Sequence, residues 1–290
     1  MANTERAAKN AEKITENRLE KSAEKRMGKR AWIGLIAAAA VFLAIFGSVW
    51  GISMLRDDAG IDDEKRAGPK NYVYESSVAT NGMELHVLRT RPSNIALEAI
   101  NDNVALTPYF GINGGFFYQS DLLSIAVVDG RPANGEPGQY GAGDENVKYA
   151  RGTLVWDGAT DTLGVQIVRN SAELAVTDRA DFWAQGGISM SLGRDAEWEA
   201  AALAENAPFP DDSRLRSAAV YDRDGNLYLV VSATKGTLAA FREAIVEKVG
   251  GGRLADGIFL DGDGSSQLRS REKELTGDNR PVVQMLRILN

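Results

Sequence analysis

One uninterrupted apolar stretch, residues 31–55, limits what this chain can fold into more than any other feature. It contains no charged residue, and Trp32 and Trp50 lie near its two ends. A helix rises about 1.5 Å per residue, so this stretch is long enough to cross a hydrocarbon core of roughly 30 Å. Tryptophan is enriched where membrane and water meet. We therefore expect one transmembrane helix that separates a short N-terminal tail from a long C-terminal part.

The charges beside this stretch predict its orientation. Residues 1–30 carry nine Lys or Arg and five Asp or Glu, and Lys29 and Arg30 directly precede the apolar run. Basic flanks are retained in the cytoplasm. The alternative is a cleaved signal peptide, whose apolar region is typically about 7–15 residues long and is followed by small residues. This stretch is longer, so we expect a single-pass anchor in the cell (inner) membrane, with a cytoplasmic tail and a periplasmic (extracytoplasmic) C-terminal domain.

The remaining chain reads as a polar linker, residues 56–70, and one domain, residues 71–290. Short β-branched and aromatic runs separated by turn residues predict many strands. We expect an α+β fold with mixed, largely antiparallel sheets and a few helices. The expected strands cover 72–76, 84–89, 95–100, 123–128, 152–156, 162–168, 217–221 and 227–232, and the expected helices cover 195–206 and 237–249.

The second of these helices has the clearer pattern. Thr237 is a suitable N-cap, and Gly250–Gly252 end the helix. Five side chains are predicted to form its apolar face, namely Leu238, Phe241, Ile245, Val246 and Val249.

Composition excludes several classes of function. The chain has no cysteine, which rules out disulfides, thiolate metal sites and a cysteine nucleophile. The net charge is −7 although the N-terminal tail is basic, so the rest of the chain is acidic and nucleic acid is not an expected partner. The only histidine, His86, lies in a strand-like run without a nucleophile-elbow motif. We interpret His86 as structural.

An acidic, glycine-containing loop follows a short apolar run near the C-terminus. Ile258–Leu260 predict a buried strand, and the next six residues are Asp261, Gly262, Asp263, Gly264, Ser265 and Ser266. Glycine allows close approach of the backbone to a ligand, so two carboxylates and several N–H donors can surround a small anionic or sugar group. A simple turn explains the same residues.

A calcium loop is a third interpretation of this segment. Asp261, Asp263, Ser265 and Glu272 have the ligand spacing of an EF-hand loop, but Ser266 stands where that loop requires glycine. No cofactor is assigned, while a divalent cation, Ca²⁺ or Mg²⁺, at Asp261 and Asp263 stays open.

A second glycine-marked segment is Gly111–Phe117. Asn113, Gly114, Gly115 and Phe116 predict a sharp bend or a close approach of the backbone to a ligand. A structural bulge packed by Phe116 is the alternative.

Four segments together resemble the phosphodiester glycosidase family. Gly111–Phe117 is similar to the family's Asn-Gly-Gly-Phe-Phe motif, and Leu260–Leu268 is similar to its Leu-Asp-Gly-Gly-Gly-Ser-Ser motif. Two weaker similarities lie between them: Gln185–Met190, with departures at Gln185 and Ile188, and the hairpin from Arg216 to residue 231. The main departure is Asp263, where the family usually has glycine.

The resemblance implies cleavage of a sugar–phosphate bond at the anomeric carbon, within a glycan or envelope polymer. From the chemistry of the residues present, we expect Asp261 to be an essential carboxylate, Asp263 to be its partner or a cation ligand, and Arg216 to be a bidentate phosphate clamp. Residues expected to bind the sugar or the phosphate are Asn113, Gly114, Gly115, Phe116, Gly262, Gly264, Ser265 and Ser266.

Two other functions stay open at this point. The domain can be a non-catalytic glycan- or phosphate-binding module in exopolysaccharide or envelope assembly. It can also be a metal-dependent phosphodiesterase, which a single histidine disfavours.

Overall fold

The computed structural model describes residues 68–290, here called the folded unit. The predicted tail, the predicted membrane helix and most of the predicted linker lie outside the described residues. Within the folded unit, no helix is long and apolar enough to cross a membrane. The unit contains two α-helices, and each described pair of strands is antiparallel. The expectation of an α+β fold with largely antiparallel sheets and a few helices is therefore confirmed for residues 68–290.

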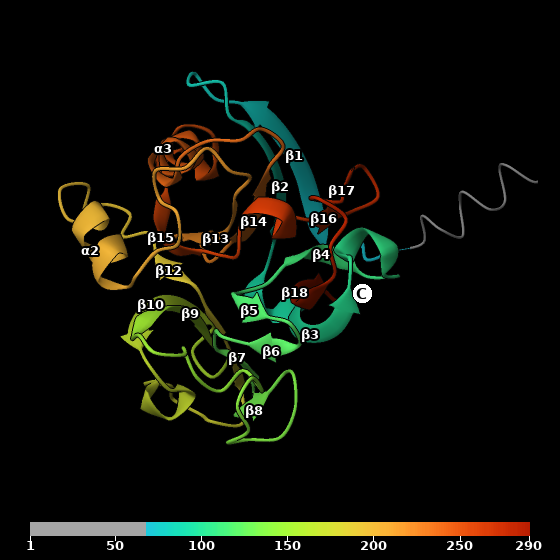
Figure 1. Ribbon diagram of the computed structural model, residues 1–290, viewed down its shortest axis with the longest axis vertical. Helices are drawn as coiled ribbons and strands as arrows, with labels where there is room; N and C mark the ends of the chain where they lie inside the picture. Colours follow the sequence, from blue (N-terminus) through green and yellow to red (C-terminus); the bar gives the residue numbers. More distant parts are fainter. Residues whose placement is uncertain (1–67) are drawn as a thin grey trace, which may run out of the picture. The chain divides into compact units, whose positions relative to one another are not determined.

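A six-stranded sheet, here called the central sheet, carries much of the fold (Figure 1). Its strands in spatial order are β1 (Tyr72–Val78), β2 (Glu84–Thr90), β14 (Leu227–Ser232), β13 (Ser217–Asp222), β15 (Leu254–Phe259) and β12 (Ile188–Ser189). The predicted hairpin at 217–232 is present as β13 and β14. The turn at Asn81-Gly82 joins β1 to β2, as glycine with a positive φ of 83° allows.

Two five-stranded sheets and one short hairpin complete the unit. The first sheet, seen at the bottom of Figure 1, contains β10 (Thr162–Val168), β9 (Arg151–Asp157), β11 (Phe182–Gly186), β7 (Ala126–Val128) and β8 (Arg131–Pro132). The second contains β17 (Glu274–Leu275), β16 (Leu268–Arg269), β4 (Phe110–Asn113), β18 (Val282–Ile288) and β3 (Ile95–Asp102). The hairpin pairs β5 (Phe117–Tyr118) with β6 (Asp121–Leu122).

The strand predicted at 123–128 is shorter in the structure. β7 covers only Ala126–Val128. The preceding residues bond to the glycine-marked segment, with Leu123 N–H donating to Phe116 O (2.8 Å) and the Ser124 hydroxyl accepting from Phe116 N–H (2.8 Å). Tertiary hydrogen bonds therefore take these residues out of the sheet.

The central sheet is covered on both faces. One face packs against the helix at 238–248, with Val87, Val230 and Phe259 from the sheet in the same core cluster as Phe241. The other face packs Leu229, Ile258 and their neighbours against side chains of the two smaller sheets. Burial on both sides explains why β14 is apolar along most of its length and does not alternate with polar residues.

The two helices are α2 (Trp198–Ala204) and α3 (Leu238–Lys248). Thr237 caps α3 as predicted, because its hydroxyl accepts from Ala240 N–H at 3.1 Å. The predicted apolar face is wrong at Val246, which is 49% exposed. Ala244 and Arg242 are buried on this helix, and the Arg242 guanidinium donates to the carbonyls of Met190 and Ser191, both at 3.0 Å.

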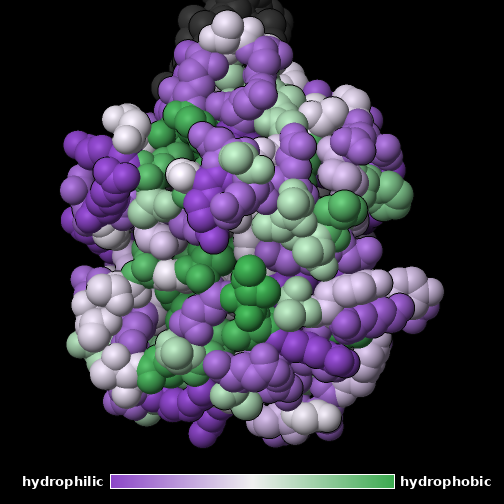
Figure 2. Space-filling model, turned by 90° about the vertical axis from the view of Figure 1, so that its left-hand side faces the viewer, coloured by the Kyte–Doolittle hydropathy of each residue, from purple (hydrophilic) through white to green (hydrophobic). Residues whose placement is uncertain are grey.

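The surface on the α2 side is uneven in its polarity. Figure 2 shows apolar surface gathered in a hollow between the upper part of the unit and the lower sheet. The outer surface around this hollow is mostly polar.

The buried face of α3 leads to a stability prediction. Phe241→Ala is expected to lower the free energy of unfolding by about 3–5 kcal/mol, because the ring is fully buried between the helix and the central sheet. Urea denaturation measures the change. Val246→Ala on the same helix is the matched control and should change the value by about 0.5 kcal/mol or less. Equal losses for the two variants would contradict this packing.

Candidate active site

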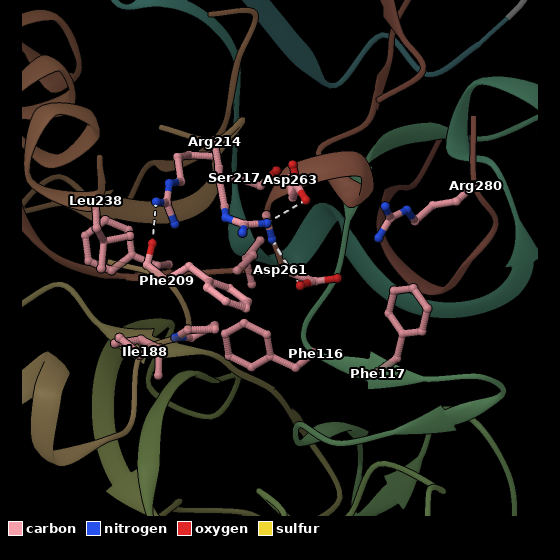
Figure 3. A pocket seen from close by; sticks show the side chains of 16 residues that line it. Phe116, Phe117, Ile188, Phe209, Arg214, Ser217, Leu238, Asp261, Asp263 and Arg280 are labelled. Carbon is pink, nitrogen blue, oxygen red and sulfur yellow. Dashed lines mark hydrogen bonds and ion pairs between the residues drawn. The ribbon is translucent and has the colours of Figure 1, made fainter. Parts of the chain in front are cut away.

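A pocket of about 310 Å³ opens beside the ends of β13 and β15. Its walls are of two kinds. One part is apolar and includes Phe116, Ile188, Phe209 and Leu238, while the other carries charged side chains from three loops (Figure 3). The charged residues that line the pocket are Arg214, Arg216, Asp261, Asp263 and Arg280. An apolar pocket with a few converging polar groups is the usual form of a small-molecule site.

The backbone of the acidic loop is tied down on two sides. Asp263 N–H donates to Leu215 O at 2.7 Å, and Asp261 N–H donates to Gly114 O at 3.2 Å. The loop leaves β15, forms a 3₁₀ turn at Asp263–Ser265 and continues into β16. It therefore joins the central sheet to the sheet that contains β4. The predicted strand before the loop is present and ends at Phe259.

The pKa of Asp261 is clearly shifted. Burial raises the pKa of Asp261 from its ordinary value of 3.8 to about 6. A hydrogen bond from the Ser265 side chain, another from Gly262 N–H (3.1 Å) and the charge of Arg280 oppose this increase. Asp261 therefore changes its charge near neutral pH while facing the pocket. Such a group suits a catalytic carboxylate.

Asp263 forms an ion pair across the pocket wall. Its Oδ2 accepts from Nη1 of Arg214 at 2.8 Å, and the two side chains point toward one another in Figure 3. Asp263 has a φ of +55°, a left-handed conformation that Asp tolerates better than most residues. The carboxylate predicted to assist Asp261 is thus neutralised by an arginine.

Arg216 is almost completely buried and is held by main-chain carbonyls. Its Nη2 donates to the carbonyls of Phe209 and Asp212, both at 2.8 Å, and its Nε donates to Gly236 O at 3.2 Å. Burial lowers the pKa of Arg216, and the nearby charge of Arg214 adds to this effect. The phosphate clamp predicted for Arg216 is untested, but these contacts give it a structural role in fixing the pocket wall.

Asn113 links three of the four segments singled out in the sequence. It is 1% exposed, and its Nδ2 donates to Asp261 O at 2.9 Å. Its Oδ1 accepts from the Ser217 hydroxyl (2.8 Å) and from Gln267 N–H (3.1 Å). The Asn113 amide therefore joins β4, β13 and the acidic loop, and its predicted contact with a ligand stays a prediction.

The predicted glycines are explained mainly by packing. A Cβ atom on Gly114 would meet the amide of Gln284, and one on Gly115 would meet Ser124 and Gln185. A Cβ atom on Gly264 would meet the carboxylate of Asp278. These glycines let neighbouring segments approach closely. Gly262 alone among the four predicted glycines lines the pocket.

The other predicted binding residues form two groups, those that line the pocket and those that are buried behind its wall. Phe116 lines the pocket, and the guanidinium of Arg151 lies 5.0 Å from the centre of its ring, so it belongs both to the pocket wall and to the core. Ser265 and Ser266 are each 1% exposed and do not line the pocket. The two serines therefore lie behind the pocket wall, and their predicted contact with a ligand stays a prediction.

The geometry does not favour the calcium-loop interpretation. Glu272, the proposed twelfth-position ligand, accepts from the Tyr72 hydroxyl at 2.8 Å. Among residues 68–290, no three His, Asp or Glu side chains are grouped so that they could hold a metal ion. His86 is buried in β2, where its ring bonds to Tyr74 (2.7 Å) and Glu84 (3.1 Å), and it does not line the pocket.

Sequence reasoning missed three residues of this pocket, namely Arg214, Phe209 and Arg280. Arg214 pairs with Asp263, and its guanidinium lies 4.0 Å from the centre of the Phe209 ring. Arg280 lies across the pocket and pairs with Asp278. The alternation Arg214-Leu215-Arg216 before β13 was a signal for Arg214, since alternate residues of an extended segment face the same way. Arg280 had no comparable signal.

Comparison with known proteins gives a likeness in fold. No family model matches the chain, and no curated protein matches it. The catalytic domain of zebrafish N-acetylglucosamine-1-phosphodiester alpha-N-acetylglucosaminidase, auto-inhibited by its pro-peptide, has a similar fold with a TM-score of 0.54. The identity is 14%, over 76% of this chain and 82% of that one. A Burkholderia pseudomallei protein named only as exported matches with a TM-score of 0.47 and 16% identity, over 72% of this chain and 74% of that chain.

Proposed function

We propose that this protein is a hydrolase that cleaves a sugar-1-phosphodiester bond in a glycan or envelope polymer. The observation that carries the proposal is the carboxylate of Asp261, with its raised pKa, in a pocket that is also lined by three arginines and by apolar walls. The fold, which is similar to that of a phosphodiester glycosidase, supports the same reaction class. The four sequence segments that resemble that family meet at this pocket.

The groups have complementary roles in this proposal. Cleavage at an anomeric carbon develops positive charge on the sugar, and an ionised Asp261 stabilises that charge. The leaving phosphate is already anionic and needs little protonation, while Arg214 and Arg280 supply positive charge for it. Phe116 and Phe209 provide apolar surface for the sugar ring. Arg216 and Asn113 hold the loops that carry these groups.

A binding module is the second candidate, and one observation favours it. Both pocket arginines that face the acidic loop are already paired, Arg214 with Asp263 and Arg280 with Asp278. Such pairing reduces the positive charge available to a transition state. In this candidate the pocket would bind a glycan or a phosphate group without turnover.

The proposal includes a location outside the cytoplasm, anchored by residues 31–55. The charge pattern of residues 1–55 supports it. Protease digestion of intact spheroplasts tests it. The C-terminal unit should be degraded without permeabilisation, and its protection would contradict this topology.

Activity is tested on the purified full-length chain. The substrates are an α-N-acetylglucosaminyl phosphodiester and a small panel of other sugar phosphodiesters, each incubated with and without EDTA. Release of free sugar supports the hydrolase, and its loss in EDTA would assign a cation requirement. A folded protein that releases sugar from none of them would favour the binding module.

The pH dependence follows from the pKa of Asp261. The role proposed here needs the ionised carboxylate, so kcat/KM should rise with pH and level off above an apparent pKa of about 6. Initial rates between pH 4.5 and 8 measure this. A profile that falls through the same range would instead show that the protonated form of Asp261 is required.

A further inference from the structure

Arg214 is held by two carboxylates that approach different parts of its guanidinium. Asp212 Oδ2 accepts from Nε (3.2 Å) and Nη2 (2.8 Å), which form one edge of the group. Asp263 Oδ2 accepts from Nη1 at the opposite end, at 2.8 Å. The guanidinium also lies against the ring of Phe209, 4.0 Å from its centre. Arg214 is therefore oriented on one edge and one face before any ligand arrives.

Only one of the two carboxylates lies in the pocket wall. Asp263 and Arg214 line the pocket, whereas Asp212 does not. The Nη1 end of Arg214 is thus the part that an anion in the pocket would meet, and the carboxylate of Asp263 already occupies it. Asp212 holds the arginine from outside the pocket, and Phe209 supports it from within the pocket wall.

We propose that Asp263 is a specificity-determining residue that acts as an internal stand-in for the anionic group of the ligand. Its carboxylate occupies the Nη1 end of Arg214 until a phosphate group displaces it. The inference rests on the proposed function, because it takes this pocket as the site for a sugar-linked phosphate. The consequence is selection against weakly held anions: a free phosphate must compete with an internal carboxylate, and a sugar phosphate gains additional contacts with the apolar wall.

The two carboxylates of Arg214 provide a matched test, because each substitution removes one negative charge from the same arginine. Asp263→Asn keeps the size of the side chain, and both Asn and Gly tolerate the positive φ at this position. Asp263→Gly is therefore the second variant. Asp212→Asn is the control. Titration calorimetry on the full-length chain uses inorganic phosphate, N-acetylglucosamine 1-phosphate and neutral N-acetylglucosamine as probes.

We expect the two Asp263 variants to bind both phosphate probes at least about tenfold more tightly than the wild type, because an internal competitor is removed. Binding of the neutral sugar should not change. Asp212→Asn should bind the phosphate probes no more tightly than the wild type, because Arg214 loses its orienting partner. Equal gains in the Asp212 and Asp263 variants would reduce the effect to net charge and overturn the proposal, as would no gain in either Asp263 variant.

The outcome is separable from that of the proposed function. Tighter binding of the phosphate probes in the Asp263 variants, without release of sugar from any phosphodiester, would retain this inference and reject the hydrolase. Sugar release by the wild type, with unchanged phosphate binding in the Asp263 variants, would retain the hydrolase and reject this inference.

Discussion

Replacing Asp261 with asparagine is expected to lower kcat for sugar release by about 10³-fold, the effect of removing a group that acts directly on the reacting atoms. Asparagine has the same shape but no charge, so it cannot stabilise positive charge at the anomeric carbon. The main-chain bonds of this residue to Gly114 and Asn113 do not depend on its side chain and should persist. Steady-state kinetics on the full-length chain measures the loss.

The stability of Asp261→Asn distinguishes the loss of a catalytic group from the loss of the fold. The folded pKa of Asp261, about 6, lies above its ordinary value of 3.8. Between these two values the folded protein holds a proton that the unfolded chain has released, so ionisation of Asp261 costs stability as the pH rises through about 6. The wild type should therefore lose stability from pH 4 to pH 7 relative to Asp261→Asn.

Urea denaturation at several pH values measures this difference. The variant should be at least as stable as the wild type at pH 7, and its advantage should be smaller at pH 4. A variant that is inactive and also unstable at pH 7 would instead show that Asp261 is needed for folding. Retention of full activity would remove Asp261 from the mechanism.

The second large effect distinguishes two neighbouring arginines. Arg214→Ala should lower kcat/KM by about 10²-fold, because it removes a cationic donor that faces the pocket. It should leave the stability nearly unchanged. Arg216→Ala should lower the free energy of unfolding by about 3 kcal/mol, because three carbonyls lose a charged donor inside the protein.

Paired kinetics and urea denaturation of these two variants decide between the assignments. Arg214→Lys and Arg216→Lys are the conservative controls, since each keeps the positive charge and loses the planar fork. The original prediction for Arg216 as the phosphate clamp would be supported if Arg216→Ala lost activity at unchanged stability. Lost activity in Arg214→Ala together with lost stability in Arg216→Ala would show that Arg214 binds the anion and that Arg216 stabilises the pocket wall.

Local signals in the sequence were sufficient for several elements of the fold. β10 and β14 begin and end where their apolar and β-branched runs do. Thr237 caps α3 because capping depends only on the next three residues. The face of α3 was predicted less well. Val246 is apolar and suitably spaced, but it is exposed, whereas Ala244 and Arg242 are buried on this helix.

The sequence by itself determined that an acidic loop follows a buried strand, because that conclusion depends on residue type and short spacing. The prediction that this loop and Asn113 belong to one site came from the family resemblance, since the two segments are distant in the chain. Only the tertiary structure decided which side chains face the pocket, because that depends on segments distant in the chain. Asn113 and Ser265 are buried behind the pocket wall. Arg216 donates its hydrogen bonds to main-chain carbonyls, and Arg214 and Arg280 line the pocket. A buried polar group must find partners, and the fold alone determines which partners are within reach.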